Sequence, residues 1–140
     1  MPSSPVRGTA CLYGCYAPDL NTQTEDYGGG PYLIMAPEMA WYWNHYLSNK
    51  ADRTNPLAAP LLADLRGLPP LFITAAECDP LRDDSELLVE KLKAADARFE
   101  FRLWTGTVHA CVNLMGWIPA MGPRVDEVCA FLRRATRSPG

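Results

Sequence analysis

The hydrophobic pattern of the chain alternates between short apolar runs and longer segments with helical periodicity. The clearest run spans residues 71–76, within the stretch LPPLFITAAECDPLRDD. Apolar and β-branched residues follow one another there without a break, which is typical of a strand buried on both faces of a parallel sheet. Pro80 cannot continue a strand and suits the first turn of a helix. This stretch therefore predicts a buried strand that passes directly into a helix.

Two further strands are predicted on either side of it along the chain. Residues 9–16 (TACLYGCY) form a short apolar run that ends at Ala17-Pro18. In residues 98–104 Phe99, Phe101 and Leu103 alternate with polar or amphipathic residues. Strict alternation indicates a strand with only one fully buried face, so the last strand is predicted to lie at a sheet edge.

Segments with helical spacing follow each strand. They cover residues 38–47, residues 81–95, and a last helix that begins at Met121 or Pro123 and ends at residue 134. The order predicts an α/β fold of three layers, a parallel sheet with flanking helices. In the middle helix Asp83 and Asp84 fall on the solvated face. The buried stripe of that helix is predicted to contain Leu81, Leu87, Leu88, Leu92 and Ala95. The last helix is predicted to bury Val125, Val128, Cys129, Phe131 and Leu132.

Composition and charge narrow the function classes. The chain has 140 residues, a net charge of −3 and no cluster of basic residues, which gives no reason to expect nucleic acid as a partner. No apolar run approaches the length of a membrane span. The five cysteines form no C-x-x-C pair, and reduced thiols in the cytoplasm are the expectation. Residues 1–8 are expected to be a lead and residues 137–140 a tail, around one domain over 9–136.

Two residues that carry chemistry follow predicted strands. Asp79 comes after the buried strand, and His109 comes after the edge strand. Ligands of open α/β sheets bind at the carboxyl ends of the strands. An acid followed by a histidine in such places is the order of the last two triad members of an α/β-hydrolase. On the residues alone, Asp79 also fits a helix-capping role, His109 a loop or core histidine, and His45 a surface or capping residue.

Several motifs together resemble the C-terminal half of a bacterial hormone-sensitive-lipase-like esterase of the α/β-hydrolase fold. They are LYGCYAPDL, YGGGPYL, the D-P-L-R-D block at residues 79–83, and TGTVHACVNL around the histidine. The resemblance implies the last three strands of that fold, with Asp79 as catalytic acid and His109 as catalytic base. It implies ester substrates and no metal or cofactor. Tyr32, Leu33, Ile34, Val112 and Leu114 are either pocket lining or plain core.

The serine nucleophile expected of that family is missing from the sequence. No Gly-x-Ser-x-Gly elbow surrounds any serine, and the resemblance places both the elbow and the His-Gly-Gly oxyanion segment before residue 9. Gly28-Gly29-Gly30 is not such a segment, because no histidine precedes it. Cys78 and Cys111 lie beside Asp79 and His109, but neither has an elbow context. The chain alone is therefore expected to be inactive.

Three interpretations follow for a chain with an acid and a base but no nucleophile. The first is a part of an esterase, completed by an N-terminal half chain; the unpaired edge of the first strand also favours homodimers. The second is a non-catalytic remnant or interaction module on the same scaffold. The third, a nucleotide-binding α/β domain, is disfavoured because no glycine-rich phosphate loop joins a strand to a helix.

Overall fold

The sheet of the computed structural model has three parallel strands, and residues 6–18 and 32–137 are described. β1 is Thr9–Leu12, β2 is Leu71–Cys78 and β3 is Phe99–Val108. Their order is β1-β2-β3, with β2 in the centre. Thr9 pairs with Leu71, which pairs in turn with Phe99, so the strands start level with one another. This order confirms the predicted parallel sheet, with β3 at an edge of the described part.

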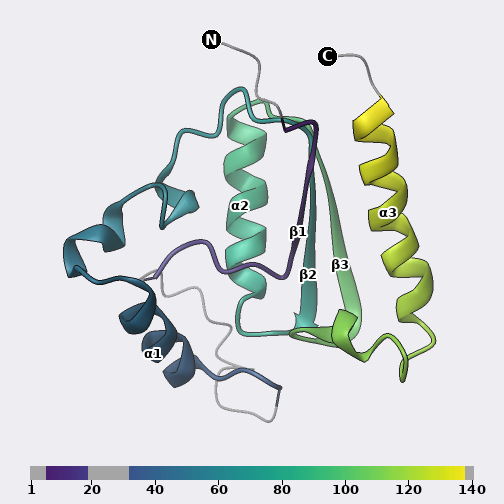
Figure 1. Cartoon of the computed structure of the whole chain (residues 1–140), viewed down its shortest axis with the longest axis horizontal. Coiled ribbons are helices and arrows are strands. Elements are labelled where there is room, and N and C mark those ends of the chain that lie inside the picture. The colour runs from purple at the N-terminus through teal and green to yellow at the C-terminus, as the bar shows by residue number, and fades with distance from the viewer. Residues whose placement is uncertain (1–5, 19–31, 138–140) are drawn as a thin grey trace.

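Helices cover both faces of that sheet. α1 is Ala36–Tyr46, α2 is Arg82–Ala94 and α3 is Met121–Arg137. Figure 1 shows α2 on one face of the sheet, α3 on the other, and α1 beside the end at which the strands finish. Short 3₁₀ helices span Lys50–Thr54, Pro60–Leu62 and Cys111–Leu114. The predicted three-layer architecture is therefore confirmed.

Alternate residues of β2 enter different cores, which explains its unbroken apolar run. Ile73 packs with Leu88 and Leu92 of α2, and Phe72 packs with Phe131 on the α3 side. The rings of Phe72 and Phe131 lie 5.5 Å apart between centroids. A strand between two helical layers has no solvent-facing side, so the pattern of alternation disappears.

Two predictions for α2 were wrong, and one geometric reason explains both. Leu87 is 40% exposed, whereas Asp84 is only 1% exposed. Residues four apart share a helix face, so Asp84 lies with Leu88 and Leu92 against the sheet. Leu87 is turned away from this stripe. The carboxylate of Asp84 is tolerated there because it accepts hydrogen bonds from the backbone N–H groups of Tyr16 and Ala17.

The ends of the strands also differ from the predicted bounds. β1 stops at Leu12 because Tyr13 has a positive φ of 40°, which no strand residue adopts. β3 continues to Val108, past an irregular register opposite Ala76 and Cys78. The longer strand carries the chain directly to His109.

The last helix, α3, is longer than predicted and buries fewer side chains. It buries Met121, Val128 and Phe131, whereas three residues of the predicted stripe, Val125, Cys129 and Leu132, are only half-buried. All five cysteines are free thiols. Among the described residues, no helix is long and apolar enough to cross a membrane. The loop of Gly28-Gly29-Gly30 and most of the predicted lead and tail lie outside the described residues.

Candidate active site

Asp79 occupies the turn between β2 and α2. Its side chain is 0% exposed. One carboxylate oxygen, Oδ1, accepts a hydrogen bond from the backbone N–H of Leu81 at 2.8 Å, which fixes the carboxylate at the start of the helix. α2 begins at Arg82, so this bond lies in the turn before the helix, and it leaves the second oxygen, Oδ2, available for another partner.

That second oxygen meets the imidazole of His109. The distance from Asp79 Oδ2 to His109 Nδ1 is 2.9 Å, although the two residues are 30 positions apart. The histidine side chain remains 21% exposed, so one part of the ring is open while its partner is buried. A carboxylate accepts hydrogen bonds, and the neutral imidazole with Nδ1–H therefore keeps an unprotonated Nε2. The structure thus brings the two predicted site residues together.

The end of β3, directly before His109, is held at several points. Gly106 has a φ of +67°, and its N–H donates to Glu77 Oε2 at 2.7 Å. The hydroxyl of Thr107 donates to the carbonyl oxygen of Trp104 at 2.6 Å. Arg124 of α3 donates to the carbonyl oxygen of Thr105 at 3.0 Å. Anchors on β2 and α3 therefore set the path of the backbone that presents the histidine.

Tyr13 is a member of this site that the sequence reasoning missed. Its ring lies edge-on to His109, with 5.0 Å between ring centroids and an interplanar angle of 63°. Burial, together with the nearby Cys111 and Asp79, raises the pKa of the Tyr13 phenol. The one signal in the sequence was an aromatic residue within a predicted strand whose neighbours carry the chemistry. That position alone does not distinguish Tyr13 from an ordinary core residue.

Two side chains, Cys111 and Ser85, lack the environment of an activated nucleophile. Cys111 is buried, and burial raises the pKa of its thiol, whereas a nucleophilic cysteine needs a lowered one. Ser85 is buried between α2 and β2, where its hydroxyl donates to the carbonyl oxygen of Thr74 at 3.4 Å. No group of three or more metal-ligating side chains occurs within residues 6–18 and 32–137.

Other sequence candidates lie apart from this pair. His45 is exposed on α1 and donates from Nδ1 to the carbonyl oxygen of Trp41 at 2.8 Å, a surface role as expected. Among the suggested lining residues, Ile34 is buried with Met39 and Trp43, whereas Leu33 is 65% exposed. Val112 packs against the core of the α3 side.

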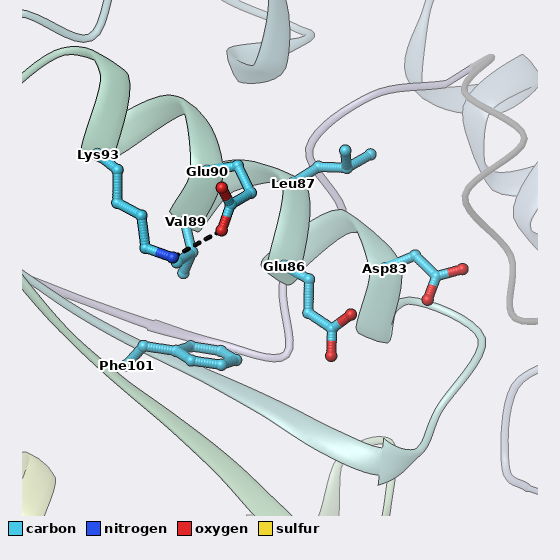
Figure 2. Close-up of a pocket in the computed structure, with 7 residues that line it drawn as sticks. All are labelled: Asp83, Glu86, Leu87, Val89, Glu90, Lys93 and Phe101. Carbon is cyan, nitrogen blue, oxygen red and sulfur yellow. Dashed lines mark hydrogen bonds and ion pairs between the residues drawn. The ribbon is translucent and has the colours of Figure 1, made fainter.

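A surface groove lies beside α2. Its volume is about 560 Å³. Figure 2 shows Glu86, Glu90 and Lys93 projecting from α2 above the ring of Phe101, with an ion pair of 2.7 Å between Lys93 and Glu90. The residues that line the groove include neither Asp79 nor His109, so the groove is not part of the candidate site.

Comparisons with known proteins match nearly the whole chain. Residues 2–113 match a family model described as alpha/beta hydrolase fold. An esterase from Pyrobaculum calidifontis is 28% identical with a TM-score of 0.82, over 95% of this chain and 44% of that one. The thermostable carboxylesterase EstE1, cloned from a metagenomic library, is 29% identical with a TM-score of 0.87, over 95% and 46%. A thermostable esterase from Pseudomonas putida is 28% identical with a TM-score of 0.72, over 94% and 41%. The chain therefore spans less than half the length of these esterases.

Proposed function

The chain belongs to the α/β-hydrolase fold family, within its hormone-sensitive-lipase-like group of esterases, and we propose that it supplies the acid and the base of a carboxylic ester hydrolase. Asp79 is the acid and His109 is the base. The observation that carries this proposal is the bond of 2.9 Å between Asp79 Oδ2 and His109 Nδ1. It joins a fully buried carboxylate to a partly exposed imidazole.

The geometry suits the two roles in a serine-hydrolase mechanism. Asp79 fixes the imidazole tautomer and stabilises the imidazolium while Nε2 takes the proton of a serine hydroxyl. The serine oxygen then attacks the ester carbonyl, and the departing alcohol takes the proton from Nε2. Water repeats the sequence to release the acid from the acyl-serine. In this proposal both the serine and the oxyanion donors come from outside these 140 residues.

The edge of β1 is the proposed place for the complementary part of the sheet. β1 is a four-residue strand at the end of the described order β1-β2-β3, and it pairs with β2 alone. A strand edge is a template for pairing. We propose that a strand of the nucleophile-bearing half pairs here, and that a second copy of this chain is the competing occupant. The cytoplasm is the proposed compartment, because all five cysteines are free thiols.

The experiment compares the 140-residue chain with a polypeptide extended by the coding sequence that precedes Met1. The extension is first read for His-Gly-Gly and Gly-x-Ser-x-Gly segments. We expect the extended polypeptide to hydrolyse p-nitrophenyl butyrate, and the 140-residue chain to show no activity above its His109→Ala variant. In the extended polypeptide His109→Ala should lower kcat by about 10⁴- to 10⁶-fold. His45→Ala removes the other histidine and is the matched control, with activity unchanged.

Three outcomes would contradict the proposal. Activity of the 140-residue chain that disappears in His109→Ala would mean that a nucleophile lies within these residues. An active extended polypeptide that tolerates both His109→Ala and Asp79→Asn would remove the pair from the chemistry. An upstream sequence without a serine elbow would favour a non-catalytic interaction module on the hydrolase scaffold.

A further inference from the structure

We infer that Tyr13 is a positioning residue for His109, presented by a turn that the buried carboxylate of Asp84 holds in place. The inference rests on the proposed acid–base pair and adds a second restraint on its imidazole. Asp79 holds the ring at Nδ1, at 2.9 Å. Tyr13 contacts the same ring edge-on, with 5.0 Å between centroids. One hydrogen bond leaves a ring able to pivot about that bond, and an aromatic contact at a different point restricts the pivot.

The backbone of Tyr13 is held in an unfavourable conformation. Its φ is 40°, in the left-handed region that bulky residues rarely adopt. Its N–H nevertheless donates to the carbonyl oxygen of Thr74 on β2 at 2.9 Å, which continues the β1–β2 ladder by one bond. Conformations of this kind persist where the surroundings over-determine them, and they concentrate at functional sites. Here the positive φ ends β1 and directs the chain into residues 14–17, the turn that follows.

Asp84 is the second anchor of that turn. Its Oδ2 accepts from the N–H of Tyr16 at 2.6 Å and from the N–H of Ala17 at 3.3 Å. The carboxylate is 1% exposed, so these bonds form without competition from water. Asp84 lies in the first turn of α2, five residues after Asp79. The start of one helix therefore fixes both the acid of the pair and the turn that carries the aromatic neighbour of the base.

The experiment measures His109 directly by NMR, on the 140-residue chain with ¹⁵N-labelled histidine. The first observable is a nuclear Overhauser contact between ring protons of Tyr13 and His109 in the unmodified chain, and its absence would overturn the inference whatever the variants do. The second is the ratio of the Nδ1–H to the Nε2–H tautomer. His45 is an internal reference in the same spectrum.

Tyr13→Leu should lower the Nδ1–H tautomer ratio of His109 by about twofold to tenfold, the range expected for the loss of one edge-to-face aromatic contact. Tyr13→Phe keeps the ring and should retain the unmodified ratio. Asp84→Ala should change the His109 ratio in the same direction as Tyr13→Leu, because it releases the turn. The His45 signals should remain unchanged in every variant. An unchanged ratio in Tyr13→Leu, or equal losses in the Phe and Leu variants, would contradict the inference.

Asp79→Asn separates this inference from the proposed function. If Asp79→Asn abolishes or reverses the tautomer preference while Tyr13→Leu leaves it intact, the acid–base pair stands and the positioning role of Tyr13 is wrong. If Asp79→Asn leaves the preference intact, the pair itself is wrong. A loss in both variants supports both.

Discussion

Two buried carboxylates lie at the start of α2, and their partners differ. One carboxylate oxygen of Asp79 accepts a hydrogen bond from the backbone N–H of Leu81, and the other is hydrogen-bonded to the imidazole of His109. One carboxylate oxygen of Asp84 accepts hydrogen bonds from two backbone N–H groups, those of Tyr16 and Ala17. The exposed fractions are 0% and 1%, so burial does not distinguish the two residues.

What distinguishes them is the chemistry of these partners. Imidazole is an acid–base side chain with two ring nitrogens, so a carboxylate bonded to one nitrogen influences chemistry at the other. A backbone amide does not titrate, so its hydrogen bond to a carboxylate fixes the position of the chain. We propose a chemical role for Asp79 and an architectural one for Asp84, and the variants below test that division by their effects on stability.

The largest expected loss of stability follows Asp84→Ala. The substitution leaves two buried N–H groups without an acceptor, and each such group costs about 1–3 kcal/mol. We expect the free energy of unfolding to fall by about 2–4 kcal/mol, measured by urea denaturation followed by circular dichroism. Asp83→Ala is the matched control on the half-exposed neighbour, with an expected loss of at most about 1 kcal/mol. Equal losses in the two variants would contradict the architectural role of Asp84.

The contrast also shows what the sequence could and could not predict. The pairing of Asp79 and His109 could be predicted because their positions depend on local pattern: each directly follows a strand. Asp84 was misplaced on the solvated face because its partners, the N–H groups of Tyr16 and Ala17, are 68 and 67 residues away along the chain. Helical periodicity assigns a charged residue to solvent unless a distant partner is known.

Tyr13 escaped the sequence reasoning for a different physical reason. Its positive φ is rare for an aromatic residue, so a pattern of apolar residues through residues 9–16 predicts a longer strand. The end of β3 was underestimated in a similar way, because Thr105 and Gly106 are not typical strand residues, yet β3 continues through them to Val108. The elements and their order followed from local pattern, and their ends depended on long-range bonds.

A smaller and pH-dependent effect is expected at Cys15, next to the turn that Asp84 anchors. Burial, reinforced by the charge of Asp84, raises the pKa of the Cys15 thiol from 9.0 to about 12. Below pH 9 both the folded and the unfolded thiol are protonated, and stability is independent of this group. Between pH 9 and 12 only the unfolded thiol loses its proton, so stability falls with rising pH, by at most about 1.4 kcal/mol per pH unit.

Urea denaturation at pH 7.5 and pH 10 checks this expectation. Cys15→Ala removes the titrating thiol and should lose less stability between the two pH values than the unmodified chain does. Cys11, Tyr16 and Cys111 also have raised pKa values, but they titrate in both proteins and cancel from the difference. Identical pH dependence in the two proteins would show that the Cys15 thiol is not buried beside the carboxylate.

The smallest loss of stability is expected for Asp79→Asn, although a large effect on chemistry is proposed for the same variant. The amide oxygen can still accept from Leu81 N–H, and the amide N–H can donate to the other tautomer of His109, so about 1 kcal/mol is the expected loss of unfolding free energy. In the extended polypeptide the same change should lower kcat by about 10⁴-fold, because it selects the wrong tautomer. If Asp79→Asn instead destabilises the chain as much as Asp84→Ala, both carboxylates hold the fold together and the division between them is wrong.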